Sequence, residues 1–226
     1  EADPVTAGDS SSTTTTAGDE VSSTSTTAGD EVSSTSTTVG STGSSVTSPS
    51  TSDLTVAVFP NPSGTTRFDD PAAAAKAFAT DYVGFVGPEV GAVNATTVEI
   101  RPDPQGPVTL VQVQQLDGSW WVTGATTANI LVASPTPLAT ITSPVALSGT
   151  STAFEATVQT QVREDGSTTP IGTGYVMGGS MGDMGPFTGS LDFTEPSTPA
   201  GAVILSTSSM ENGEVWEATV VRVRFG

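Results

Sequence analysis

The stretch from Phe154 to Arg163, FEATVQTQVR, has the clearest two-residue alternation in the chain. Its apolar face is formed by Phe154, Ala156, Val158 and Val162, and its polar face by Glu155, Thr157, Gln159, Gln161 and Arg163. Successive side chains of a β-strand point to opposite faces of the sheet. The stretch therefore predicts a strand with one face in a core and the other face in water.

Further strand candidates flank this stretch, and turn residues separate them. They are Ala139–Thr142, Val145–Ser148, Ile171–Met177, Phe187–Phe193, Val203–Thr207 and Val215–Phe225. In the last candidate the apolar residues change face after Val220, so we expect a β-bulge near that residue. About seven short strands in about 90 residues are typical of an immunoglobulin-like β-sandwich, which we assign to residues 139–226.

The preceding residues, 53–134, predict a small α+β domain in which one helix packs on an antiparallel sheet. Asp70 is a preferred N-cap, Pro71 suits the first helical position, and helix-forming residues continue to Phe85. Asp117-Gly118 is a strong hairpin signal between the last two predicted strands. The strand candidates are Leu54–Phe59, Thr96–Ile100, Val108–Leu116 and Trp120–Val132. The fold class is therefore mainly β.

A linker and a tail complete the predicted organisation. Pro135 and Pro137 mark residues 135–138 as a short linker. Residues 1–52 contain 29 Ser or Thr, seven acids, and no Lys, Arg or aromatic residue. The unit TAGDEVSSTST occurs at Thr16–Thr26 and again, unchanged, at Thr27–Thr37. Such a segment cannot bury enough apolar surface to offset its loss of chain entropy, so we expect a disordered Ser/Thr-rich stalk.

Composition excludes several classes of function. The formal net charge is −18, from 24 acids and six bases, which disfavours binding to nucleic acid or to an anionic membrane. Cysteine and histidine are both absent, so disulfides, thiolate catalysis and His-based or Cys-based metal sites are excluded. No apolar run approaches the length of a transmembrane helix. The chain begins at Glu1, and we expect a processed product whose signal peptide or lipid-bearing cysteine lies upstream.

The remaining candidate chemistry is sparse, and no catalytic residue or cofactor is expected. Paired carboxylates are one option for an enzyme, among Asp69, Asp70, Asp81, Glu89, Glu99 and Asp103. The Gly-rich run 177–185 contains Met177, Met181, Met184 and Asp183, and its thioethers are weak candidate ligands for a soft metal such as Cu(I). Methionines folded over a sandwich edge explain the same run without any metal.

Trp120 and Trp121 are the candidate ligand-binding residues. As neighbours on a strand they point to opposite faces, so at most one belongs to the core. The other is a candidate to stack on a sugar or on a partner protein, although a Trp at a domain junction explains the same position.

Seven short pieces of residues 141–225 together resemble the bacterial immunoglobulin-like domain named for spore germination, Gmad2. The pieces are Ile141–Pro144, Gly149, Phe154–Ala156, Asp165-Gly166, Gly185–Phe187, Ser206–Gly213 and Val223–Phe225. The resemblance implies an immunoglobulin-like fold in exported proteins of Gram-positive bacteria, often anchored lipoproteins. It supplies no catalytic residue. The Asp70-Pro71 helix start and Gly118–Val122 also look like a recurring partner of this module in actinobacterial surface proteins.

These observations predict a non-enzymatic binding or scaffold module at the cell surface, displayed on the Ser/Thr-rich tether. The expected partner is a cell-wall component, a glycan or a protein. One alternative is a structural protein that self-associates into a fibre or layer through exposed strand edges. The other alternative, which the residues favour least, is a carboxylate-dependent enzyme.

Overall fold

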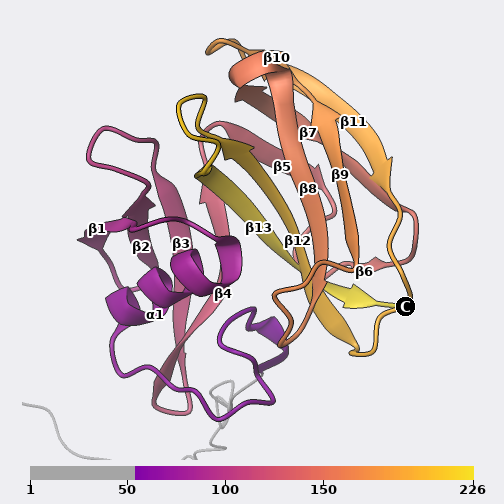
Figure 1. The fold of residues 1–226 in the computed structure, drawn as a ribbon. Coiled ribbons are helices and arrows are strands. Elements are labelled where there is room, and N and C mark those ends of the chain that lie inside the picture. The colour runs from indigo at the N-terminus through magenta and orange to yellow at the C-terminus, as the bar shows by residue number, and fades with distance from the viewer. Residues whose placement is uncertain (1–53) are drawn as a thin grey trace, which may run out of the picture. The chain divides into compact units, whose positions relative to one another are not determined.

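A computed structural model describes residues 54–226 of the protein (Figure 1), and the tail predicted at 1–52 lies outside these residues. The helical elements are η1 (Leu54–Val56), α1 (Pro71–Ala77), η2 (Phe78–Val83) and η3 (Phe154–Ala156). The strands are β1 (Glu89–Val93), β2 (Thr97–Arg101), β3 (Thr109–Leu116), β4 (Ser119–Thr127), β5 (Ile130–Ser134), β6 (Thr140–Ile141), β7 (Val145–Ala153), β8 (Thr157–Glu164), β9 (Gly172–Met177), β10 (Gly179–Ser180), β11 (Gly185–Leu191), β12 (Ala200–Ser208) and β13 (Val215–Phe225). The fold is mainly β, as the sequence predicts.

The strands form one long antiparallel sheet with a second layer over part of it. The long sheet runs in the order β1-β2-β3-β4-β13-β12-β8-β9. The second layer is formed by β5, β7 and β11, which pair antiparallel with one another. In Figure 1, α1 lies beside β1 to β4, and the second layer lies beside β8, β9 and β12. The sheet therefore carries a helix at one end and a sandwich at the other.

Two hydrophobic cores lie on opposite faces of this sheet, and β12 and β13 contribute to both. The helix-side core contains Phe78, Tyr82, Ile100 and Val111 together with Ala218 and Val220 of β13. The sandwich core contains Val158, Val162, Phe187 and Leu205 together with Val221 and Val223 of β13. Alternate residues of one strand therefore belong to different cores.

This double burial corrects the bulge predicted near Val220. The pairing of β13 with β12 is regular through that residue, and its register shifts only at Thr207/Ser208. The apolar residues change face without an inserted residue because both faces of β13 are covered. A strand buried on both sides needs apolar residues at consecutive positions and loses the alternation of a half-exposed strand.

The alternation predicted for Phe154–Arg163 holds only in part. Phe154 and Ala156 lie in η3, before β8 begins at Thr157, and Glu155 and Ala156 have φ values of 54° and 61°. Phe154 is exposed and not part of the core face. Arg163, predicted to face water, is buried and donates a hydrogen bond from Nη1 to the carbonyl oxygen of Tyr82. The face of β8 that was predicted to be solvent-exposed is buried at Arg163, because η2 packs over it.

The predicted helix is confirmed at its start and altered at its end. The carboxylate of Asp70 accepts a hydrogen bond from the amide of Ala73 at 2.8 Å, and Pro71 is the first helical residue. The α-helix ends at Ala77 and continues as the π-helical turn η2. Gly84 ends that turn in a left-handed conformation, with a φ of 101°.

Among the strands of this half, the hairpin at Asp117-Gly118 is confirmed, with positive φ at both residues. The predicted strand Trp120–Val132 is two strands, β4 and β5, separated by a turn at residues 128–129. Strand β1 was not predicted, because its residues are all exposed and carry no alternation. None of the helices within residues 54–226 has the length and apolar character needed to cross a bilayer.

Candidate functional site

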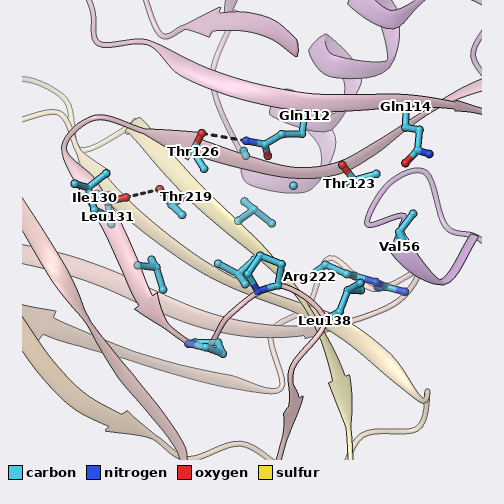
Figure 2. A pocket seen from close by; sticks show the side chains of 17 residues that line it. Val56, Gln112, Gln114, Thr123, Thr126, Ile130, Leu131, Leu138, Thr219 and Arg222 are labelled. Carbon is cyan, nitrogen blue, oxygen red and sulfur yellow. Dashed lines mark hydrogen bonds between the residues drawn. The ribbon is translucent and has the colours of Figure 1, made fainter. Parts of the chain in front are cut away.

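A groove of about 480 Å³ lies where β5 and the linker diverge from β3, β4 and β13. Gln112 and Gln114, which line it, alternate along β3 with Val111 and Val113 of the helix-side core. Figure 2 shows side chains from β3 and β4 on one side of it and from β5, the linker and β13 on the other. The lining residues are Val56, Gln112, Gln114, Thr123, Gly124, Ala125, Thr126, Ile130, Leu131, Val132, Pro135, Pro137, Leu138, Thr219, Val220, Val221 and Arg222.

A bulge in β4 shapes the floor of this groove. Gln112 pairs with Gly124 and the next residue, Val113, pairs with Val122, so Thr123 is the extra residue of the bulge. Gly124 lies close to β13, and a Cβ atom at this position would come within 2.9 Å of the carbonyl oxygen of Val220. A bulge bends its strand and re-aims the side chains beside it. Here it turns Thr123 into the groove.

The two walls of the groove differ in polarity. On the sheet side, the amide of Gln112 donates a hydrogen bond to the hydroxyl of Thr126 at 3.0 Å (Figure 2). On the opposite side β5 and the linker contribute apolar residues, and Leu131 is 53% exposed. Such a site offers neutral donors and acceptors to one edge of a ligand and apolar contact to the other.

Among residues 54–226, Arg222 is the one ionisable residue that lines the groove, and its hydrogen-bonding groups are engaged within the protein. Its Nε donates to the carbonyl oxygen of Thr55 at 2.8 Å, and its Nη2 donates to Oδ2 of Asp165 at 2.8 Å. The groove lining therefore provides no free acid, base or nucleophile for catalysis.

A buried carboxylate, which the sequence analysis did not single out, lies away from this groove. Glu217 of β13 accepts hydrogen bonds from the amide of Asn129 at 3.0 Å, from the hydroxyl of Thr207 at 3.3 Å and from the hydroxyl of Thr127. Burial raises the pKa of Glu217 above its ordinary value, although these hydrogen bonds oppose the rise. The carboxylate ties the β4–β5 turn to the hairpin of β12 and β13.

The carboxylates proposed as an enzymatic pair include residues with local structural partners. Asp70 caps α1, and the carboxylate of Asp103 accepts a hydrogen bond from the amide of Gln105 at 2.8 Å. Within residues 54–226, no three His, Cys, Asp or Glu side chains are grouped so that they would hold a metal ion.

The two candidate tryptophans occupy different environments. Trp121 is 1% exposed, its Nε1 donates to the carbonyl oxygen of Leu116 at 3.2 Å, and the Arg67 guanidinium lies 4.7 Å from the ring centroid. Trp120 is half-buried and packs against the helix-side core. Of the two, only Trp120 is partly exposed, and ligand binding there stays a prediction.

The methionine-rich run forms a compact turn. Met177 ends β9, Met181 follows β10 and Met184 precedes β11, and all three side chains are exposed. The amide of Asp183 donates to the carbonyl oxygen of Ser180 at 3.0 Å, which closes the turn. Metal binding by Met177, Met181, Met184 and Asp183 also stays a prediction.

Comparison with known families identifies the sandwich. Residues 129–214 match Gmad2, the immunoglobulin-like domain of bacterial spore germination. This part of the chain is similar to a Gmad2 domain. The match begins at the β4–β5 turn, earlier than the resemblance at residues 141–225, and so includes β5 of the second layer. No curated protein and no solved structure matches the chain.

The Gmad2 match ends before β13, which completes both cores. It also leaves out one side of the groove, because Gln112, Gln114 and Thr123 precede it. Sequence analysis did not predict the groove, since its lining comes from six separated stretches of chain and no motif joins them. The groove is therefore lined partly by the region similar to Gmad2 and partly by strands outside that region.

Proposed function

We propose that this protein is a non-enzymatic binding module, displayed outside the cell, which holds an uncharged segment of a partner in the groove between β4 and β5. The observation that carries the proposal is the groove lining itself. It combines neutral amides and hydroxyls with an apolar wall, and its single cation is already paired. The similarity of residues 129–214 to an immunoglobulin-like domain supports a binding role.

The chemistry of the lining favours an extended peptide over a glycan. Gln112, Gln114 and Thr126 lie along the sheet side, where their amides and hydroxyls both donate and accept hydrogen bonds. The opposite wall contains Leu131 and Leu138 with two prolines. In the part of the chain that the structure describes, no aromatic side chain lines the groove, whereas sugar recognition commonly uses an aromatic ring to stack on.

The setting of this module is proposed from composition. Residues 1–52 serve in this proposal as a Ser/Thr-rich tether between the folded part and an anchor on the cell surface. Absence of cysteine and histidine, and a net charge of −18, fit a displayed protein that neither turns over substrate nor binds nucleic acid.

A binding experiment on the full chain tests this function. The probes are an array of uncharged peptides in extended form and an array of cell-wall glycans. Leu131→Asp places a charge on the exposed apolar wall, and Gln114→Ala removes an exposed amide from the sheet side. Thr188→Asp, an exposed change on β11 outside the groove, is the matched control.

Peptide binding that weakens at least about tenfold in the two groove variants and not in Thr188→Asp is the expected result. Glycan binding with the same dependence would place the ligand in the groove but correct its class. An absence of binding to both arrays, or equal binding by all variants, would refute the groove as the functional site.

A structural role has one observation in its favour. Strand β1 is an edge of the long sheet, and all five of its residues are exposed, so its backbone is open to another strand. Like-charge repulsion between copies carrying 24 acids opposes such assembly. Light scattering over a concentration series separates the two: a mass that grows with concentration favours assembly, and a constant monomer mass rejects it.

A further inference from the structure

A second hollow, of about 470 Å³, lies at the end of the sandwich where β10 and the β12–β13 turn are found (Figure 1). We call it the methionine pocket. Its lining residues are Asn129, Thr152, Ala153, Phe154, Met181, Gly182, Thr207, Ser208, Ser209, Met210, Glu211, Trp216 and Glu217. It shares no lining residue with the groove described above.

Large apolar side chains are left in solvent at this pocket. Met181 is 79% exposed, Met210 is 74% exposed and Phe154 is 44% exposed, and all three line the hollow. Covering such surface is favourable in water. Methionine is unbranched and polarisable, so it adapts to partners of different shape and is common at peptide-binding surfaces.

The backbone holds these side chains in place. Met181 has a φ of 54°, as does Glu155 beside Phe154, and this left-handed region is uncommon for residues other than glycine. The amide of Gly182 donates to the Thr152 hydroxyl at 3.0 Å, which fixes the turn to β7. Strained backbone of this kind concentrates at functional sites. The exposed methionine is therefore presented by an ordered turn.

The charge around the pocket is of one sign. Glu211 and Glu217 line it, and Glu155 and Asp183 lie next to or close to lining residues along the chain. None of the six basic residues, all of which the structure describes, lines it. A partner that buries the methionines must also offset this negative field, because an anionic partner would be repelled and a neutral one would leave the field uncompensated.

We propose that the methionine pocket binds a basic, amphipathic peptide segment of a protein partner. Apolar side chains of that segment enter between Met181 and Met210, and its lysines or arginines lie over Glu211 and the neighbouring acids. This differs from the neutral segment proposed for the groove in its site, its charge and its residues.

The test uses the full chain and a short fluorescein-labelled peptide of alternating leucine and lysine, with binding followed by fluorescence anisotropy. Two further peptides separate the contributions: serine with lysine keeps the charge without apolar contact, and leucine with glutamate reverses the charge. The pocket variant is Met181→Ser with Met210→Ser. The control variant is Met177→Ser with Met184→Ser, the same chemical change at two exposed methionines outside the lining.

We expect the leucine–lysine peptide to bind, and the pocket variant to weaken that binding at least about tenfold, because it removes two thioethers that the bound peptide would cover. The control variant should change it no more than about twofold, and Glu211→Gln should weaken it further at low salt. The proposal would be overturned if both double variants lost the same affinity for the leucine–lysine peptide. It would also be overturned if the serine–lysine peptide bound equally tightly, or if the leucine–lysine peptide did not bind. Leu131→Asp must leave this binding unchanged, which separates it from the groove.

Discussion

The guanidinium of Arg222 on β13 holds the carboxylate of Asp165, in the turn after β8, through two hydrogen bonds, with Nη2 2.8 Å from Oδ2. Both side chains are largely removed from water. The same guanidinium donates to the carbonyl oxygen of Thr55 in η1, at the start of the predicted α+β region. One side chain therefore connects the start of the described chain to the sandwich.

Breaking this pair should be costly. Asp165→Asn leaves the Arg222 charge buried without its counter-ion, and we expect a loss of about 3–5 kcal/mol of unfolding free energy. Urea unfolding followed by circular dichroism measures the change. Arg224→Gln, at an exposed position two residues along β13, is the control and should stay within about 0.5 kcal/mol of the wild type. Similar losses in the two variants would contradict the assigned role of the pair.

Glu217 should make stability depend on pH in an unusual direction for an acid. Its folded pKa is raised above the unfolded value, near 4.5, mainly because burial disfavours the charged form. The stability that this group contributes is fully present below the unfolded pKa and is lost as pH rises through the folded pKa. Glu217→Gln cannot ionise. Its stability relative to the wild type should therefore increase as the pH rises through the folded pKa of Glu217.

Unfolding midpoints of the two proteins across a pH series measure this difference. Glu211→Gln, the same change at an exposed position, is run beside it as the matched control. If the stability of Glu217→Gln relative to the wild type decreased with rising pH, the pH dependence would have the opposite sign and the prediction would be wrong.

Gly124 should not tolerate a side chain. A Cβ atom there meets the backbone carbonyl of Val220 at 2.9 Å and Oε1 of Gln112 at 3.0 Å, and the backbone cannot move without disturbing the joint between β4 and β13. We expect Gly124→Ala to cost about 1–3 kcal/mol. At Gly91 on the exposed edge, the nearest atom belongs to the flexible Glu99 side chain, so Gly91→Ala should cost less. Thermal unfolding of both variants measures the contrast, and equal costs would argue against a rigid joint at Gly124.

The two tryptophans should separate stability from binding. Trp121→Ala removes a buried indole, and we expect a loss of about 3–5 kcal/mol. Trp120→Ala removes a half-buried ring and should cost less, so it is the variant to use in binding assays. Loss of ligand binding in Trp120→Ala with retained fold would establish the role predicted for this residue, and unchanged binding would remove it.

Local signals predicted the elements that depend on neighbouring residues. Asp70-Pro71 starts the helix as predicted, and Asp117-Gly118 forms the hairpin turn because both residues accept positive φ. The strand count and turn residues were sufficient for the sandwich class. These features are decided within a few residues of chain.

Features that depend on distant partners were not predicted. Arg163 looked solvated because its polarity fits a wet face, yet η2 covers it from 80 residues away and Tyr82 accepts its hydrogen bond. The two-faced burial of β13 likewise depends on which layers flank it. The groove and the methionine pocket were missed for the same reason. Each is lined by turns and strands that are far apart in the sequence, and no local sequence pattern predicts that they lie together.

The hairpin of β12 and β13 places side chains in both hydrophobic cores, and this couples the two halves in folding. Residues 54–134 expressed alone would expose the apolar surface that Ala202, Ile204 and Ala218 now cover. We therefore expect one cooperative unfolding transition for residues 54–226 instead of two, with superimposable curves from Trp fluorescence and circular dichroism. The same coupling implies that the helix-bearing half cannot be transplanted to another protein by recombination unless this hairpin travels with it.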